Sequence, residues 1–186
     1  KNAISTTAII AVTSGIFLLI TGLLIAKPIL EALDTPEDVI DLAVLYLRIY
    51  SLGMPFMMIY NFGAAILRSL GDTKRPFYSL VVAGAINVGL NLLLVIEFEM
   101  SVAGVAVATV ISNIVNAGII VFFLTHEKGV FRLELKQLSI SKAELKKILQ
   151  IGVPAGIQGM VFSISNVFVL ATINSFGSAA VAGSSA

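Results

Sequence analysis

Long stretches without charged side chains constrain this chain more than any other feature of its sequence. A helix of about 20 apolar residues crosses the roughly 30 Å hydrocarbon core of a bilayer. Five stretches are long enough, and only Arg48 interrupts one of them: residues 3–26, 42–67, 76–96, 100–125 and 148–186. Because the last stretch is too long for one crossing, its "SFGS" at 175–178 predicts a turn there and the start of a sixth helix.

The composition agrees with a membrane environment. The chain is 58% hydrophobic and 12% charged, with a mean hydropathy of +1.00, whereas soluble domains are about 45–50% apolar and about 25% charged. A net charge of +1 gives no reason to expect nucleic acid as a partner, and no Cys is present for thiolate chemistry. With His126 as the only histidine, no His-built metal site is expected. We therefore predict an all-α polytopic membrane protein whose main partner is the lipid bilayer.

The two ends of the sequence read as internal to a larger protein. The chain starts without Met and stops within the apolar "VAGSSA". A helix that begins and never crosses is hard to reconcile with the need to pair every backbone polar group inside a membrane. We expect this chain to be one part of a longer transmembrane polypeptide.

Lysine and arginine are distributed unevenly between the segments that join the apolar runs. Cytoplasmic loops of membrane proteins are enriched in these cations. Ten of the twelve gather on one side if that side holds Lys1, residues 68–76 and residues 126–147. The loops of the other side contain acids and Lys27. The cationic side is therefore predicted to be cytoplasmic.

Helix-start signals occur before two of the runs. Thr35 is a candidate N-cap, with Pro36 at the first helical position. Ser141 and Glu144 have the spacing of a capping box and would open a short amphipathic helix, residues 141–150, at the lipid surface. We therefore predict three parts: four spans in residues 1–125, a cytoplasmic linker in residues 126–147, and the start of a second bundle in residues 148–186.

Two predicted spans carry polar residues on one helix face. In the third span Asn87 and Asn91 share a face with Gly84, and in the fourth Thr109 shares one with Asn116 and with Ser112 or Asn113. Amide and hydroxyl oxygens in hydrocarbon either join helices by hydrogen bonds or bind an ion or substrate. Oxygen donors suit a hard cation. The spacing alone leaves both interpretations open.

The second and fifth spans raise a similar choice. Pro154 lies near the start of the fifth span, followed by Gln158 and Asn166, and the second span contains Pro55 and Asn61. Each span is either a kinked packing helix or a hinge that lines a polar cavity.

The remaining charges and motifs give no support for an enzyme. Arg48 is the only charge within a span, and we expect it to reach the interface or to pair with Asp41. No His-Glu-x-x-His, Gly-x-Ser-x-Gly or phosphate-binding glycine loop occurs. No catalytic residue and no cofactor are therefore predicted.

Several segments in order resemble one family of transporters. Residues 46–77 read "YLRIYSLGMPFMMIYNFGAAILRSLGDTKRPF", which is similar to the fourth helix and the "LRxxGDTxxP" turn of the multidrug and toxic compound extrusion (MATE) family. The segments "INVGLNLLLV" and "VAGVAVATVIS" resemble its fifth and sixth helices. The segments "ILQIGVPAGIQGMVFSISNVFV" and "INSFGSAAVAG" resemble its seventh helix and the start of its eighth. The likeness covers essentially the whole chain.

The resemblance implies a two-lobe transporter of twelve helices, of which this chain supplies helices three to seven and the start of eight. The other half of the same transporter chain would then be its partner. The resemblance also implies alternating access, in which small organic, often cationic compounds leave the cell in exchange for Na+ or H+. We expect an integral protein of the plasma membrane with no cofactor besides the coupling ion.

The resemblance further implies a cation site at Asn87, Asn91 and Thr109, completed by an Asp on the family's first helix. Many members have an acid where Asn91 stands, and some have a Glu near the position of Phe162. An amide binds sodium through its oxygen but carries no proton, so Asn91 favours either sodium or coupling at a site elsewhere in the protein. Asn61, Gln158 and Asn166 are the residues expected to face the substrate cavity. No metal other than Na+ is predicted.

Three alternatives to this antiporter are kept. A lipid-linked oligosaccharide flippase has a related two-lobe plan, but it would need cavity cations, and the spans offer only Arg48. A non-transporting membrane scaffold would have no solvent-accessible cavity. An integral membrane enzyme would need carboxylates or histidines from helices outside this chain.

Overall fold

A computed structural model describes residues 2–32 and 36–175, and within these ranges every regular element is helical. The long helices are α1 (Asn2–Ala32), α2 (Glu37–Leu52), α3 (Met54–Ser69), α4 (Lys74–Leu92), α5 (Ser101–Thr125) and α6 (Lys142–Ser175). A π-helical turn, η1 (Leu93–Glu97), continues α4. Two short 3-10 turns, η2 (Gly129–Phe131) and η3 (Leu135–Gln137), lie between α5 and α6. The predicted all-α class is confirmed.

The chain divides into two compact units, residues 1–141 and residues 142–186. In the first unit α1, the bent pair α2–α3, α4 with η1, and α5 are each long and apolar enough to cross a membrane, and in the second unit α6 is. These helices follow the five predicted runs, because apolar length alone decides which segments can span. The chain is therefore an integral membrane protein.

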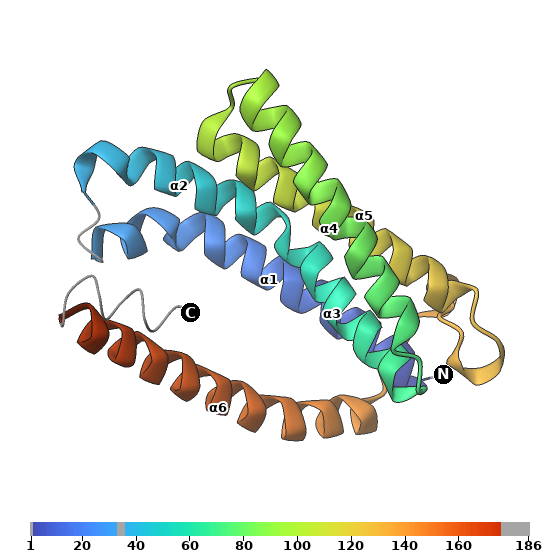
Figure 1. Cartoon of the computed structure of the whole chain (residues 1–186). Coiled ribbons are helices and arrows are strands. Elements are labelled where there is room, and N and C mark those ends of the chain that lie inside the picture. Colours follow the sequence, from blue (N-terminus) through green and yellow to red (C-terminus); the bar gives the residue numbers. More distant parts are fainter. Residues whose placement is uncertain (1, 33–35, 176–186) are drawn as a thin grey trace. The chain divides into compact units, whose positions relative to one another are not determined.

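The second predicted span is broken at Gly53. There α2 and α3 meet at an angle of 44° (Figure 1). Pro55 stands in the first turn of α3, where it has no N–H to donate to α2. A Cβ added at Gly53 would lie 3.1 Å from Asn113 Nδ2 on α5 and 3.3 Å from the Tyr50 oxygen. The bend thus combines a proline with a glycine that lies close to α5.

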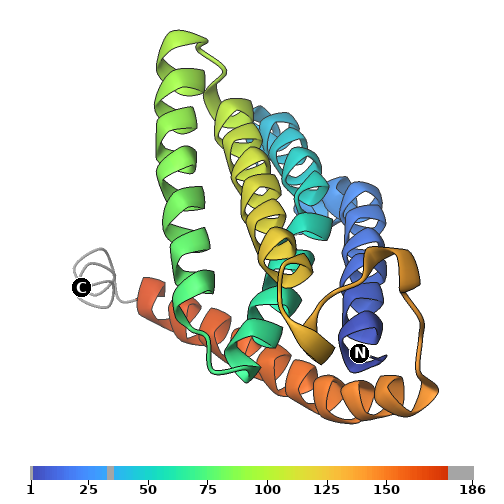
Figure 2. The same ribbon diagram turned by 90° about the vertical axis from the view of Figure 1, so that its right-hand side faces the viewer.

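Close helix contacts hold the first unit together. Helix α1 packs against α2 and α3, and α5 packs against α2, α3 and α4; Figure 2 shows α5 between α4 and the bent pair. A Cβ added at Gly15 on α1 would collide with Pro55 Cα, and one at Gly63 would collide with Ile120 Cγ2. Small residues allow this approach where no hydrophobic effect drives helices together.

The segment after α5 folds onto the first unit. Leu133 is buried in one cluster with Ile4, Leu67 and Ile120, and its N–H donates to the Leu124 oxygen at 2.9 Å. At the end of the segment, the Ser141 N–H donates to Thr6 Oγ1 at 3.0 Å. Residues 126–141 therefore close one end of the bundle.

Two predictions about helix starts are wrong in detail. The Ser141 N–H bonds to Thr6 Oγ1, and the Glu144 carboxylate lies 3.4 Å from Lys147 Nζ, so the reciprocal bond of a capping box is not made. No separate amphipathic helix forms, because α6 runs without a break from Lys142 through Pro154. A proline inside a long apolar helix need not end it when the surroundings are lipid.

Other local predictions concern residues at or beyond the ends of the described ranges. Pro36, predicted at the first helical position, occupies the N-cap position of α2 instead. Thr35, the residues 176–178 of the predicted turn, and the predicted eighth helix lie outside the described residues.

An ionic network joins the α3–α4 turn to the end of α5. Asp72 Oδ1 accepts hydrogen bonds from the Lys74 and Arg75 N–H groups at 3.0 and 3.1 Å. The Arg75 guanidinium pairs with the other Asp72 oxygen and with Glu127 Oε2 at 2.6 Å. It also lies 5.8 Å from the centre of the Phe123 ring. The "GDTKRP" turn, interpreted from sequence as an orientation signal and as part of a family motif, thus also joins the α3–α4 turn to α5, and we call this ionic network the clamp.

The clamp lowers the pKa of Asp72. The Arg75 backbone N–H is the largest cause, and the Arg75 guanidinium adds to it, while burial acts in the opposite direction. Because the pKa in the folded protein lies below that of the unfolded chain, the stabilisation is present above the unfolded value. It is lost as the pH falls through the lowered pKa.

Asp72→Asn should therefore reduce stability near neutral pH by about 1 kcal/mol, a value discounted for partial exposure. The difference from the wild type should shrink as the pH falls below the lowered pKa of Asp72. The measurement is the fraction of the intact protein that stays monodisperse in detergent after heating, at several pH values. Asp41→Asn, an exposed acid on α2, is the control, and an equal loss there would contradict the clamp.

Gly15→Ala should destabilise the intact protein by about 1–3 kcal/mol, because the added methyl meets the Pro55 backbone, which cannot move aside. Gly84→Ala on α4 is the matched control, since a Cβ there meets nothing within 4 Å. Alanine is also the better helix former by about 1 kcal/mol, so the control should be neutral or stabilised. Heating followed by size-exclusion chromatography compares the two, and equal behaviour would refute the close contact.

Candidate functional site

Buried hydrogen bonds join α4 to α5. Ser112 Oγ donates to the Ala83 oxygen at 2.8 Å. Ser79 Oγ bonds to Asn116 Oδ1 and lies 3.3 Å from the Asn116 carbonyl oxygen. All three polar side chains are buried. For Ser112 and Asn116, the sequence left helix-joining and ion-binding roles open, and the structure shows the helix-joining one.

These bonds fix the antiparallel register of the two helices. Moving one turn along α5 from Ser112 toward its start leads to Thr109, which lies at the depth of Ile86 and Asn87 on α4. The Thr109 hydroxyl donates to the Val105 oxygen of its own helix at 3.0 Å. The register thus brings Thr109 level with Asn87, without a hydrogen bond between them among the described contacts.

Asn87 and Asn91 form a pair one helical turn apart. Asn91 Nδ2 donates to Asn87 Oδ1 at 2.9 Å. The second polar atom of Asn91, Oδ1, is buried and has no hydrogen-bond partner in the described part of the chain. A buried polar atom left unpaired costs about 1–3 kcal/mol. The site therefore presents one amide oxygen that needs a donor or a cation.

The backbone changes directly after this pair. The helix widens into the π-helical turn η1, a geometry that is frequent at functional sites. The following turn places Glu99 and Ser101 at φ values of 50° and 49°, which non-glycine residues rarely adopt. Asn91 also lines a shallow depression of about 330 Å³ with four apolar side chains. The amide pair thus borders both an irregular backbone and an apolar surface.

The predicted cavity residues lie on two different units. Asn61 is exposed on α3 of the first unit. Gln158 and Asn166 are exposed on α6 of the second unit. A common cavity formed by these three residues stays a prediction.

Arg48, the one charge within a predicted span, is exposed on α2. The ion pairs found in the described ranges do not include one between Arg48 and Asp41. Of the two expectations for Arg48, the intramolecular pair is therefore not formed.

Two residues that position the helices around α5 were missed by the sequence interpretation. Ser79, the partner of Asn116, was not selected, because a lone serine near a helix start gives no periodic signal. Gly53, which lies beside Asn113, was not recognised as the break between α2 and α3. A glycine two residues before a proline is a signal that could have indicated it.

Comparisons with known proteins identify relatives of this chain. The family model MatE matches residues 1–93. The chain is 33% identical to the probable multidrug resistance protein YoeA of Bacillus subtilis, over 98% of this chain and 41% of that protein. It is 35% identical to the probable multidrug resistance protein YpnP of the same organism, over 87% of this chain and 36% of that protein.

The fold has a counterpart among solved structures. A crystal structure of MATE in complex with MaD3S aligns with a TM-score of 0.85 and 25% identity, over 95% of this chain and 40% of that one. A second structure is a transporter of the MOP superfamily from Pyrococcus furiosus, described as having a binding pocket of reversed polarity. It aligns with a TM-score of 0.84 and 25% identity, over 92% of this chain and 38% of that one.

The chain spans about two fifths of the length of the curated relatives that it matches. The family and these relatives indicate a transporter rather than an enzyme. The helices follow one another as in solved MATE transporters, and half of the chain matches the family model. The chain therefore belongs to the MATE family of multidrug and toxic compound extrusion proteins.

Proposed function

We propose that the intact protein is a cation-coupled antiporter that exports amphipathic organic compounds by alternating access. Its family membership and the multidrug resistance named for its relatives support export as the activity. The observation that carries the ion-coupled part is the buried, unpartnered Oδ1 of Asn91 beside Asn87.

Sodium is the coupling ion that fits this pair best. Asn87 and Asn91 are neutral at all physiological pH values, so they supply oxygen ligands but carry no proton. Hard cations prefer oxygen ligands. A sodium ion at Asn91 Oδ1 would satisfy the one buried side-chain acceptor that the described structure leaves unpaired. Thr109, level with Asn87, is proposed as a third ligand through its hydroxyl oxygen.

Coupling requires that the ion and the organic compound favour different states. A ligand shifts an equilibrium only by its difference in affinity for the two states, and the effect of two such ligands on each other is reciprocal. Transporters of this kind expose a midplane site alternately to either side of the membrane. We propose that sodium entry favours the state that releases the exported compound outside.

The substrates and the location follow from the same reasoning. Amphipathic, often cationic organic compounds are proposed as the exported class, with Asn61, Gln158 and Asn166 facing them in the cavity. The end of the bundle that holds residues 68–76 and 126–141 is proposed to face the cytoplasm of a cell whose plasma membrane contains the protein.

The oligosaccharide flippase finds less support. Pyrophosphate-linked cargo needs several cations along its path, and Arg48 is the only charged residue within the predicted spans. No observation in the described structure favours this alternative.

Asn91→Ala and Thr109→Val should each reduce sodium binding and sodium-driven efflux by at least about tenfold, since each removes one oxygen ligand. The measurements are binding of radioactive sodium to the purified intact protein and efflux of a cationic dye from proteoliposomes with an imposed sodium gradient. Ser165→Ala is the control, because it removes a hydroxyl of the same local type, bonded to Val161 at 2.9 Å, from a helix outside the assigned ion site, and it should leave both unchanged.

A second variant tests the choice of ion. Asn91→Asp introduces a group that titrates, so efflux should become responsive to a proton gradient while sodium binding persists. If both alanine and valine variants still bind sodium and transport at wild-type rates, the assigned site is wrong. If the wild type moves dye with a proton gradient alone, sodium is the wrong ion.

A further inference from the structure

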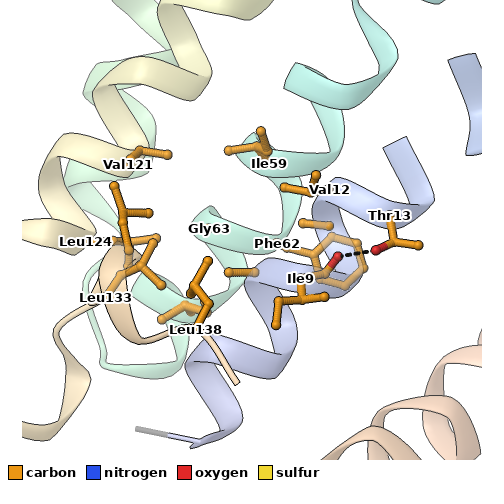
Figure 3. A pocket seen from close by; sticks show the side chains of 14 residues that line it. Ile9, Val12, Thr13, Ile59, Phe62, Gly63, Val121, Leu124, Leu133 and Leu138 are labelled. Carbon is orange, nitrogen blue, oxygen red and sulfur yellow. Dashed lines mark hydrogen bonds between the residues drawn. The ribbon is translucent and has the colours of Figure 1, made fainter. Parts of the chain in front are cut away.

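An apolar groove opens beside residues 126–141, away from the asparagine pair. It lies between α1, α3 and α5 and has a volume of about 270 Å³. Figure 3 shows Val121, Leu124 and Leu133 on one side of it and Ile9, Val12 and Thr13 on the other. The groove lies entirely within the first unit.

The interior of the groove offers only apolar contacts. Thr13 is the one residue with a polar side chain among those lining it, and its hydroxyl donates to the Ile9 oxygen of its own helix at 2.8 Å. Phe62 and Leu138 are among the apolar residues of the lining. A ligand part without hydrogen-bonding groups, such as a hydrocarbon chain, would therefore bind there without leaving a polar atom unpaired.

The mouth of the groove is basic. Leu133 and Leu135 line both the groove and an adjoining open depression. Two cations, Arg132 and Lys136, and one acid, Glu134, also line this depression. Arg132 Nε donates to the Thr125 oxygen at 2.9 Å, which fixes the orientation of the guanidinium group. The apolar groove thus continues directly into a rim with a net positive charge.

We propose that this groove binds an anionic phospholipid, with one acyl chain in the groove and the phosphate at Arg132 and Lys136. The volume lies below the roughly 300–1,000 Å³ of pockets for drug-sized ligands, which suits part of one acyl chain, with the rest of that chain in the bilayer. The rim lies just beyond the end of α5, at the boundary between membrane and water. Basic pockets between transmembrane helices at this boundary bind anionic head groups. The proposal does not rest on the transport activity.

The test uses the intact protein in vesicles that contain phosphatidylglycerol or phosphatidylcholine with a photoactivatable group on one acyl chain. After irradiation, mass spectrometry of the peptides locates the labelled residues. We expect label on peptides of α1, α3 and α5 that line the groove, and at least about fivefold more from phosphatidylglycerol than from phosphatidylcholine.

Two pairs of variants separate the chain site from the head-group site. Val12→Trp fills the groove and should lower labelling at least about fivefold, whereas Ile16→Trp, exposed on the same helix but outside the lining, should not. Arg132→Ala with Lys136→Ala should abolish the preference for phosphatidylglycerol. Lys146→Ala with Lys147→Ala removes the same number of charges from α6 and should preserve it. Monodisperse elution and wild-type heat resistance identify variants that fold.

Three results would overturn the proposal. The first is an absence of label from the groove peptides of the wild type, as when another helix of the intact protein fills the groove. The second is equal labelling by the two lipids. The third is displacement of the lipid by a transported dye, which would assign the groove to the export path. Dye efflux with an imposed sodium gradient is measured in parallel, so failure of the lipid site and failure of the antiporter are distinguishable.

Discussion

The hydrocarbon core of the membrane contains no water, so each polar group of these helices must find its partner within the protein. Most described hydroxyls do so locally, as Thr13 does with Ile9 and Thr109 with Val105. Two others bond across the α4–α5 interface, Ser79 to Asn116 and Ser112 to Ala83, and thereby set the register of the bundle. Asn91 Oδ1 is the exception among buried side-chain atoms in the described ranges. Because this constraint is strict, we propose that the exception at Asn91 Oδ1 marks the ion site.

The same constraint explains how much of the fold was predictable. A span needs only apolar length, which is a property of consecutive residues, so the spans could be found from the sequence. The burial of Leu133 depends on residues far away in the sequence, namely Ile4, Leu67 and Ile120. The clamp at Asp72 also depends on a distant residue, because Arg75 pairs with Glu127 more than 50 residues away, and the sequence contains no pattern that indicates this pair. Tertiary contacts of this kind leave no periodic pattern.

The candidate site was predictable to the extent that it is local. Asn87 and Asn91 are four residues apart, and helix geometry alone brings such side chains together. The depth of Thr109 depends on a register that Ser79 helps to set, and no spacing in the sequence selects that serine. A cavity shared by Asn61, Gln158 and Asn166 requires two units to approach each other. For these three residues, the prediction that they face a cavity still rests on the resemblance to the MATE family.

The unpartnered oxygen also has an energetic role in the proposed exchange. Leaving a buried amide oxygen unpaired costs about 1–3 kcal/mol, and coupling free energies between two ligand sites are typically of the same size. A cation that relieves this cost in only one state would change the balance between the states by about 5- to 150-fold. A fully satisfied amide pair would have been the more stable arrangement within α4 but would have given the ion nothing to relieve. The defect in hydrogen bonding is therefore what would let an ion without contact to the exported compound decide which side of the membrane the cavity faces.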